Sequence, residues 1–402
     1  MSNRYKLFFF ALILASFNLR PGITSVSPLL HGITDELGMS STTASLLTSI
    51  PLLCMGIGSL FAGRLASRFQ SEKIITIFIA CIGIATFLRF FASSPVYLLI
   101  TALFIGVGIG IVSPLMSGFI KTYFADQVAL MIGMYSTFMV VGASIAVGFT
   151  TPIQHWFSDS WKVGLGFWFI FAVIAIPLWM AIIKHPHTLQ QRATVQQRSS
   201  LPLKNKQAWL LTSFAGLATL LFYCISAWLP AIVEDKGYSS SYAGLVGTLC
   251  MMAQLPVTLC LHLLLRAIPS RKFWITFFVG SEMTGLILLG FTSVTPILAG
   301  IFLGISAGGL ISLTLLLPID KTNSPIEAST WSAMTQAIGY MIGAIGPILI
   351  GFLYDYTGSF RPTMYLLIVM GLIVIFLGWK IAKPVEKTTL HVNITRSSDE
   401  YV

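Results

Sequence analysis

Charged residues are scarce in this sequence. They make up 9% of its 402 residues, while 55% are hydrophobic and the mean hydropathy is +0.85. A soluble domain carries roughly 25% charged residues, so the composition excludes an ordinary water-soluble protein. No Gly is followed by Lys, which excludes a Walker A loop and an ATP-driven motor, and no H-E-x-x-H zinc motif is present.

Cysteine is also sparse and unpatterned. The five cysteines form no C-x-x-C pair and have no histidine at a zinc-binding spacing. All five fall in apolar stretches, and we interpret them as small buried hydrophobic residues: Cys54, Cys81, Cys224, Cys250 and Cys260. We therefore expect no disulfide, no metal site, no cofactor and no enzymatic activity.

Long apolar segments take the place of charge. A bilayer core about 30 Å thick needs roughly 20 apolar residues per helix, and such windows recur along the whole chain. The sequence predicts an all-α membrane protein with twelve spans, at about 7–31, 43–63, 74–92, 95–118, 128–152, 163–183, 207–233, 242–265, 273–292, 296–318, 329–353 and 362–382. The first apolar stretch continues past Arg20 without a small-x-small cleavage site, so we interpret it as a retained span and not as a signal peptide.

The net charge of +10 is unevenly placed along these spans. Of the 24 Lys and Arg, all but five fall in termini and loops on one side of the membrane; the five are Arg20, inside a span, and Arg89, Lys162, Lys236 and Arg361, toward the other side. This is the positive-inside pattern, so we expect a multi-pass protein of the cell membrane with both termini in the cytoplasm. The basic charge is thus explained without nucleic-acid binding.

A repeat divides the chain in two. Three segments recur at an offset of about 200 residues: 38–44 at 237–243, 104–110 at 302–308, and Gly142-Ala143 at Gly343-Ala344. We predict two pseudo-symmetric six-helix bundles, 1–183 and 207–383, with a cytoplasmic linker 184–206, a cytoplasmic tail 384–402 and a substrate site between the bundles. The alternative is that glycine-rich membrane helices match by coincidence. The shared glycines are interpreted as close-contact and hinge positions.

Arg20 is the residue that most strongly indicates function. An Arg in the middle of a membrane helix costs about 2.5 kcal/mol or more, so such residues usually serve a function. Pro21 and Gly22 follow directly, which predicts a kink or an unwound turn at the charge. Helical spacing would place five polar residues on one face toward a watery cavity: Ser16, Arg20, Thr24, Ser27 and His31.

Two motifs resemble a known family. Gly63-Arg-Leu-Ala-Ser-Arg68, after the second span, resembles the loop signature of the major facilitator superfamily. The segment from Asn18 to Leu30, N-L-R-P-G-I-T-S-V-S-P-L-L, together with L-L-T-S-I-P-L-L from Leu46, resembles its cyanate-transporter and 2-nitroimidazole-exporter branch. The resemblance implies the major facilitator fold, alternating access and a small solute, often anionic or weakly acidic.

Glu282 is the only carboxylate at a depth comparable to Arg20. The fold implied by the resemblance places its span outside the cavity-lining helices, so we expect Arg20 to have no internal partner and to bind an anion. The alternative for Arg20 is a buried salt bridge. Glu282 is either a proton-coupling residue or a packing carboxyl kept neutral by desolvation. We interpret Arg89 as a headgroup anchor.

Further polar residues are candidates for contact with the solute. The substrate-binding set comprises Arg20, Asn18, Thr24, Tyr223, Gln254, Gln336 and Tyr340. The two amides stand out because a side-chain amide in hydrocarbon needs a hydrogen-bond partner. Other residues on the same faces are Thr219, Ser226, Pro230, Met251, Thr258, His262, Ser332 and Gly343.

The sequence therefore predicts a secondary transporter for a small anionic or weakly acidic solute, in contact with the lipid bilayer and acting as a monomer. The membrane potential would drive a free monoanion outward, and uptake would need a proton or an exchanged anion, so the sequence leans toward export or exchange. The alternatives are proton-coupled efflux of amphipathic drugs and, in another class, a receptor or scaffold that transports nothing.

Overall fold

The computed structural model describes residues 3–124, 127–157, 159–183, 201–292, 295–322 and 325–382. Within these ranges every regular element is a helix. The predicted tail 384–402 and most of the predicted linker, residues 184–200, lie outside them.

The helices fall into two sets along the chain. The first set is α1 Asn3–Asn18, α2 Pro21–Thr24, η1 Ser27–Leu29, α3 Leu30–Leu37, α4 Ser41–Arg68, α5 Ser71–Leu88, η2 Arg89–Phe91, α6 Pro95–Tyr123, α7 Val128–Trp156, α8 Trp161–Gly166, η4 Phe167–Phe169 and α9 Ile170–Ile183. The second is α10 Lys206–Asp235, α11 Ser240–Ala267, α12 Arg271–Phe291, α13 Pro296–Asp320, α14 Pro325–Gly343, α15 Ile345–Thr357 and α16 Arg361–Ile381. Among the described residues, 12 segments are long and apolar enough to cross a membrane, and each overlaps one predicted span. The predicted all-α membrane fold is confirmed.

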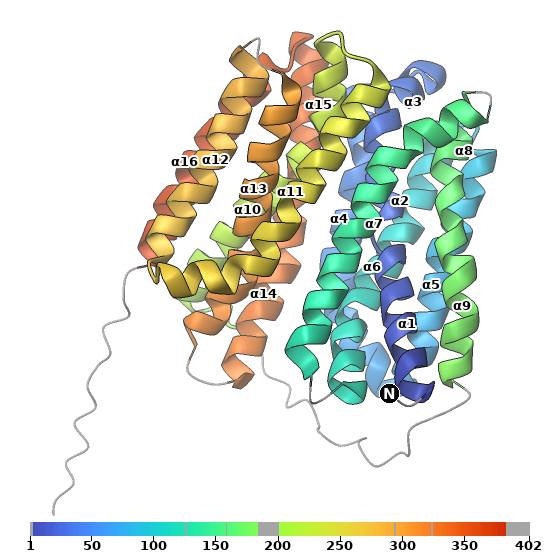
Figure 1. Ribbon diagram of the computed structural model, residues 1–402, viewed down its shortest axis with the longest axis vertical. Helices are drawn as coiled ribbons and strands as arrows, with labels where there is room; N and C mark the ends of the chain where they lie inside the picture. The colour runs from blue at the N-terminus through green and yellow to red at the C-terminus, as the bar shows by residue number, and fades with distance from the viewer. Residues whose placement is uncertain are drawn as a thin grey trace, which may run out of the picture.

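The two sets form two bundles that stand side by side (Figure 1). We call the end of the molecule that holds the N-terminus the N-terminal end. The opposite end, which includes the turns at 38–40, 236–239 and 358–360, is called the far end. Successive spans run alternately between these two ends.

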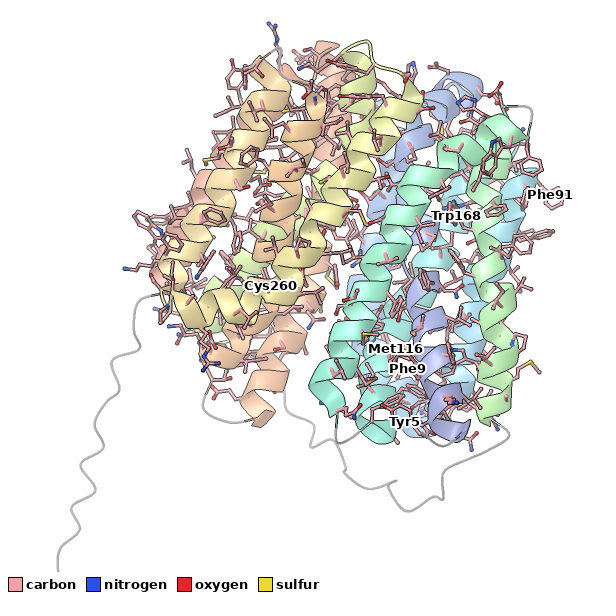
Figure 2. All side chains as sticks on the ribbon, in the orientation of Figure 1. Tyr5, Phe9, Phe91, Met116, Trp168 and Cys260 are labelled. Carbon is pink, nitrogen blue, oxygen red and sulfur yellow. The ribbon has the colours of Figure 1, made fainter. Side chains whose placement is uncertain are left out.

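Large apolar side chains cover the outside of both bundles. Phe91 projects outward from the first bundle and is 62% exposed (Figure 2). Such a surface fits hydrocarbon and not water. Cys260 lies on this surface, so its predicted burial is wrong; Cys224 and Cys250 are buried, and Cys54 and Cys81 are partly buried.

The repeated segment before the second helix of each bundle builds the same turn twice. Gly38 and Gly237 both adopt a positive φ, 60° and 90°, which a glycine adopts without strain. Two residues later, Ser40 Oγ accepts a hydrogen bond from Thr43 N at 3.1 Å, and Ser239 Oγ accepts one from Tyr242 N at 3.3 Å. Each serine is an N-cap, so the sequence repeat is also a repeat of local structure.

The repeated glycines lie where helices touch. A Cβ on Gly106 of α6 would lie 2.4 Å from Pro51 Cα of α4, and one on Gly304 of α13 would lie 2.1 Å from the Cys250 carbonyl oxygen of α11. Either contact is too short for any side chain. The predicted close-contact role of these glycines is confirmed, once in each bundle.

At the far end the two bundles are joined by hydrogen bonds from one carboxylate. Asp355 of α15 accepts from the backbone N–H groups of Ser41 and Thr42, both at 2.8 Å, and from Thr42 Oγ1 at 2.6 Å. These N–H groups belong to the first turn of α4 in the other bundle, so Asp355 caps that helix across the interface.

Candidate functional site

The first span is broken at the position of its charge. Pro21 has no N–H to continue the helix, and α1 ends at Asn18. Arg20 then adopts φ −123° and ψ −41°, and its carbonyl oxygen accepts from Ile23 N at 2.9 Å and Thr24 N at 3.0 Å to begin α2. The predicted break at Arg20-Pro21-Gly22 is confirmed.

The Arg20 side chain reaches from this break to the other bundle. Its Nη1 donates to the hydroxyl of Tyr223 in α10 at 2.8 Å. The Tyr223 and Tyr340 rings lie edge to face with centroids 6.5 Å apart, and the guanidinium also interacts electrostatically with Tyr340 and Tyr135. The half-buried charge is thus surrounded by phenol groups from α7, α10 and α14.

No carboxylate neutralises Arg20 among the described residues. The ion pairs found there do not include it. Glu282 lies in α12, is 3% exposed and lines a cavity inside the second bundle. The salt-bridge alternative therefore has no partner in the described part of the chain.

A second arginine, Arg89, binds a backbone carbonyl of the broken segment. Val26 N donates to the carbonyl of Ile23 and not to that of Gly22, so the helix leaves the Gly22 carbonyl free. Arg89 Nη1 donates to this carbonyl at 2.7 Å, and Arg89 Nε donates to Thr101 Oγ1 at 3.2 Å. Arg89 is 0% exposed, so its interpretation as a headgroup anchor is wrong.

The predicted polar face of the first span is interrupted by the break. His31 lies exposed toward the far end, with its Nε2 3.5 Å from the Asp35 carboxylate. Ser16 donates to Leu12 O, Thr24 to Arg20 O, and Asn18 to Leu14 O and Phe171 O, whereas Ser27 reaches Ala227 O of the other bundle at 2.9 Å. The prediction of one continuous helical face is wrong, because the span is interrupted after Asn18 and again after Thr24.

The remaining candidates divide between two places. Gln336 is exposed on α14, one turn from Tyr340, while Gln254, Met251 and Ser226 line the cavity that contains Glu282. The other candidates belong to neither place. Thr219 packs on Gly343, Thr258 donates to Gly308 O at 3.5 Å, Pro230 is buried in α10, and Ser332 is half-buried in α14. The side chain of His262 lies outside the described part of the structure.

Two motif positions differ from what their patterns suggest. Gly63 and Arg68 belong to α4, which ends at Arg68, so the loop-like signature forms the end of a helix. The chain also contains one G-x-S-x-G string, Gly304-Ile-Ser306-Ala-Gly308. It lies inside α13, where Ser306 donates to Glu282, and not at the strand-to-helix turn that a hydrolase nucleophile needs.

Sequence reasoning missed Tyr135 in α7 and Ser113 in α6; Tyr135 interacts with both Ser113 and Arg20. No repeat, motif or charge marks either residue in the sequence. Their place at the site follows only from the packing of the bundles.

A polytopic carrier built from two six-helix bundles is the class of protein that these features define. The sequence matches the Major Facilitator Superfamily over residues 8–344, and the chain belongs to this family. It is similar to the uncharacterized transporter YycB of Bacillus subtilis, 32% identical over 89% of both chains. It is also similar to the cyanate transport protein CynX of Escherichia coli, 29% identical over 91% of this chain and 95% of that one, and to the 2-nitroimidazole transporter of the same organism, 29% identical over 93% and 95%.

Solved structures share the fold. The nucleoside transporter NupG superposes with a TM-score of 0.76 over 96% of this chain and 100% of that one, at 14% identity. The D-xylose-proton symporter also gives 0.76, over 93% and 98%, at 15% identity. Membership of the Major Facilitator Superfamily and similarity to transporters over most of the chain make the protein a membrane transporter and not an enzyme.

Proposed function

We propose that this transporter carries a small monovalent anion and binds it at Arg20. The observation that supports this most strongly is a guanidinium between the two bundles that donates to the Tyr223 hydroxyl and, within the described residues, pairs with no carboxylate. A fixed cation without an internal counter-ion attracts negative charge, and its remaining N–H groups are suited to an oxyanion or a carboxylate.

The names of the relatives agree with this chemistry. Cyanate is a small anion and 2-nitroimidazole is a weak acid, and these solutes are named for two relatives that align over most of this chain. A lipophilic cation, the typical substrate of a multidrug efflux protein, would be repelled by Arg20. Anion transport therefore fits the site better than drug efflux does.

We propose that the bundles rock about Arg20 in alternating access. The hydrogen bonds of Asp355 hold the far end together, and Gly148 of α7 meets Thr248 of α11 in the same half of the molecule. Because basic residues are concentrated at the N-terminal end, we assign that end to the cytoplasm and the far end to the outside. In this proposal the structure represents the state that is closed to the outside.

A thermostability screen tests the proposed site. Purified protein is heated with cyanate, nitrate, formate, bicarbonate or benzoate, and the anion that raises the melting temperature most is then used as a radiolabelled solute for counterflow in proteoliposomes. We expect at least one anion to stabilise the wild type, because a bound ligand adds RT ln(1 + [L]/Kd) to the free energy of unfolding. Arg20→Ala should lose both the stabilisation and the counterflow.

Arg361→Ala is the matched control, because Arg361 is an exposed arginine at the start of α16. It should keep the response of the wild type. Equal stabilisation and counterflow in wild type and Arg20→Ala, or no response of the wild type to any of the five anions, would refute the proposal.

A further inference from the structure

The second bundle contains a buried acid that the Arg20 site does not use. Glu282 of α12 is 3% exposed and lies among residues of α10, α11 and α13. Within the described part of the chain it accepts one side-chain hydrogen bond, from Ser306 Oγ to Oε2 at 3.3 Å. A lone hydroxyl does not offset the cost of burying a carboxylate charge in an apolar bundle.

The groups that face Glu282 are neutral. Cys224 of α10 and Cys250 of α11 interact with it electrostatically, and Ser306 faces it from α13. Among the described residues, no charged side chain of α13 or of α16, the other helix packed on α12, interacts with it. Burial without a cation nearby disfavours the charged carboxylate of Glu282 in this conformation.

A carboxylic acid has one O–H to donate, and the same cavity offers an acceptor. Gln254 of α11 is 7% exposed, and its Oε1 has no hydrogen-bond partner among the described residues. An unpaired buried carbonyl oxygen is costly, so it should have a donor. Gln254 and Glu282 line one small cavity of about 10 Å³, which has room for roughly one water molecule.

We propose that Glu282 is a proton-binding site, with its O–H donating to Gln254 Oε1 directly or through one water molecule. In this arrangement the acid gains an acceptor and the amide gains a donor. The proton binds to Glu282 from water on one side of the membrane, and it leaves the carboxylate for water on the other side when the bundles rock and hydrate the cavity.

This inference rests on the proposed anion transport and adds its coupling ion. The membrane potential, negative inside, opposes the uptake of a free anion. A proton carried on Glu282 together with one anion makes the transport step electroneutral. The cavity also adjoins the anion site, because Phe222 lines it and packs edge to face on Tyr223 with ring centroids 4.9 Å apart.

Infrared spectroscopy tests the proton without any transported solute. Wild-type protein in liposomes should show the C=O stretch of a buried protonated carboxyl, which moves on transfer to D₂O. Glu282→Gln should remove this band, Gln254→Leu should shift it to the frequency of a carboxyl without that acceptor, and Thr284→Ala should leave it unchanged. Thr284 is the matched control, since it is an exposed residue of the same helix.

A band that survives Glu282→Gln overturns the proposal, and so does a band that Gln254→Leu leaves unshifted. If Glu282→Gln does not fold, the Gln254→Leu shift still decides, since that variant keeps the acid. A second readout is cyanate flux into proteoliposomes with and without an inward pH gradient. The ratio of the two fluxes should exceed one for wild type and fall to one for Glu282→Gln; an unchanged ratio, or one that follows a sodium gradient, overturns proton coupling.

The two proposals fail separately. The infrared band does not depend on Arg20 or on any anion, so its absence refutes the proton site and leaves the anion site standing. Conversely, a normal response of Arg20→Ala to anions refutes the anion site and leaves the band in place.

Discussion

The first helices of the two bundles run in the same direction but differ in continuity. The second bundle begins with α10, a single helix of 30 residues although Pro230 lies inside it. The corresponding span of the first bundle is divided into α1, α2, η1 and α3. Proline alone therefore does not divide a membrane helix in this protein.

Neighbouring side chains make the difference. In the first bundle Arg89 bonds the carbonyl of Gly22 that the break leaves free, and Arg20 bonds Tyr223 of the unbroken α10. Free backbone groups at membrane depth need such partners, because lipid offers none. The continuous helix α10 thus supplies the hydroxyl of Tyr223, to which Arg20 of the broken span donates a hydrogen bond.

Removing the support of the break should have the largest effect. Arg89→Ala leaves the Gly22 carbonyl unpaired and a cavity behind it, and we expect it to lower the free energy of unfolding by about 2–4 kcal/mol and to stop transport. Melting temperature and counterflow check this, and Arg89→Lys should recover part of both. If Arg89→Ala were as stable as the wild type, the broken conformation at Arg20-Pro21-Gly22 would not depend on the hydrogen bond from Arg89.

Replacing Pro21 and Pro230 by Ala in separate variants tests why the first span is broken and α10 is continuous. Pro21→Ala restores an N–H that can extend α1, which would shift Arg20, and we expect counterflow to fall about tenfold, equivalent to about 1.4 kcal/mol. Pro230→Ala should change counterflow by less than about twofold, since α10 is already continuous. Equal losses in the two variants would contradict the role assigned to the break.

A comparable effect is expected where the two helices meet at the charge. Tyr223→Phe keeps the ring and removes the hydroxyl that accepts from Arg20, and a hydrogen bond to a charged group contributes about 1.5–3 kcal/mol. The apparent KM for the anion should rise about tenfold, as measured from the concentration dependence of counterflow. An unchanged KM would show that Tyr223 does not orient Arg20.

The smallest effect is expected at the second contact between these helices. Ser27→Ala removes one bond to the Ala227 carbonyl, worth about 1 kcal/mol, so the melting temperature should drop by about 2 °C with little change in flux. Thermal unfolding in detergent measures it. A drop as large as that of Arg89→Ala would show that the hydrogen bond from Ser27 stabilises the broken span as much as the one from Arg89 does.

Much of this organisation could be predicted from the sequence, because the bilayer dictates it. Apolar length gave the twelve spans, the recurrence of Gly38 at Gly237 gave the two bundles, and Pro21 with Gly22 gave the break. Tyr223 was also among the predicted substrate-binding residues, and it is the residue that Arg20 bonds.

The failures come from long-range contacts. A helical face extrapolated from Ser16 to His31 assumes a continuous helix, and the predicted break itself makes that assumption wrong. Arg89 points inward and binds the Gly22 carbonyl, which is free only because the first span is broken there. The sequence around Arg89 does not reveal that partner. Gln254 lies with Glu282 and not with Arg20, since helix packing separates polar residues that appear equivalent on a helical wheel.

Asp355 has a consequence for how fast the transporter can turn over. It completes the first turn of a helix that belongs to the opposite bundle, and a helix cap of this kind contributes about 1 kcal/mol. Water can replace a carboxylate at such a helix end with little loss. In the proposed alternating access, these hydrogen bonds would close the far end with a specific geometry but little energy, so thermal motion would suffice to break them in each cycle.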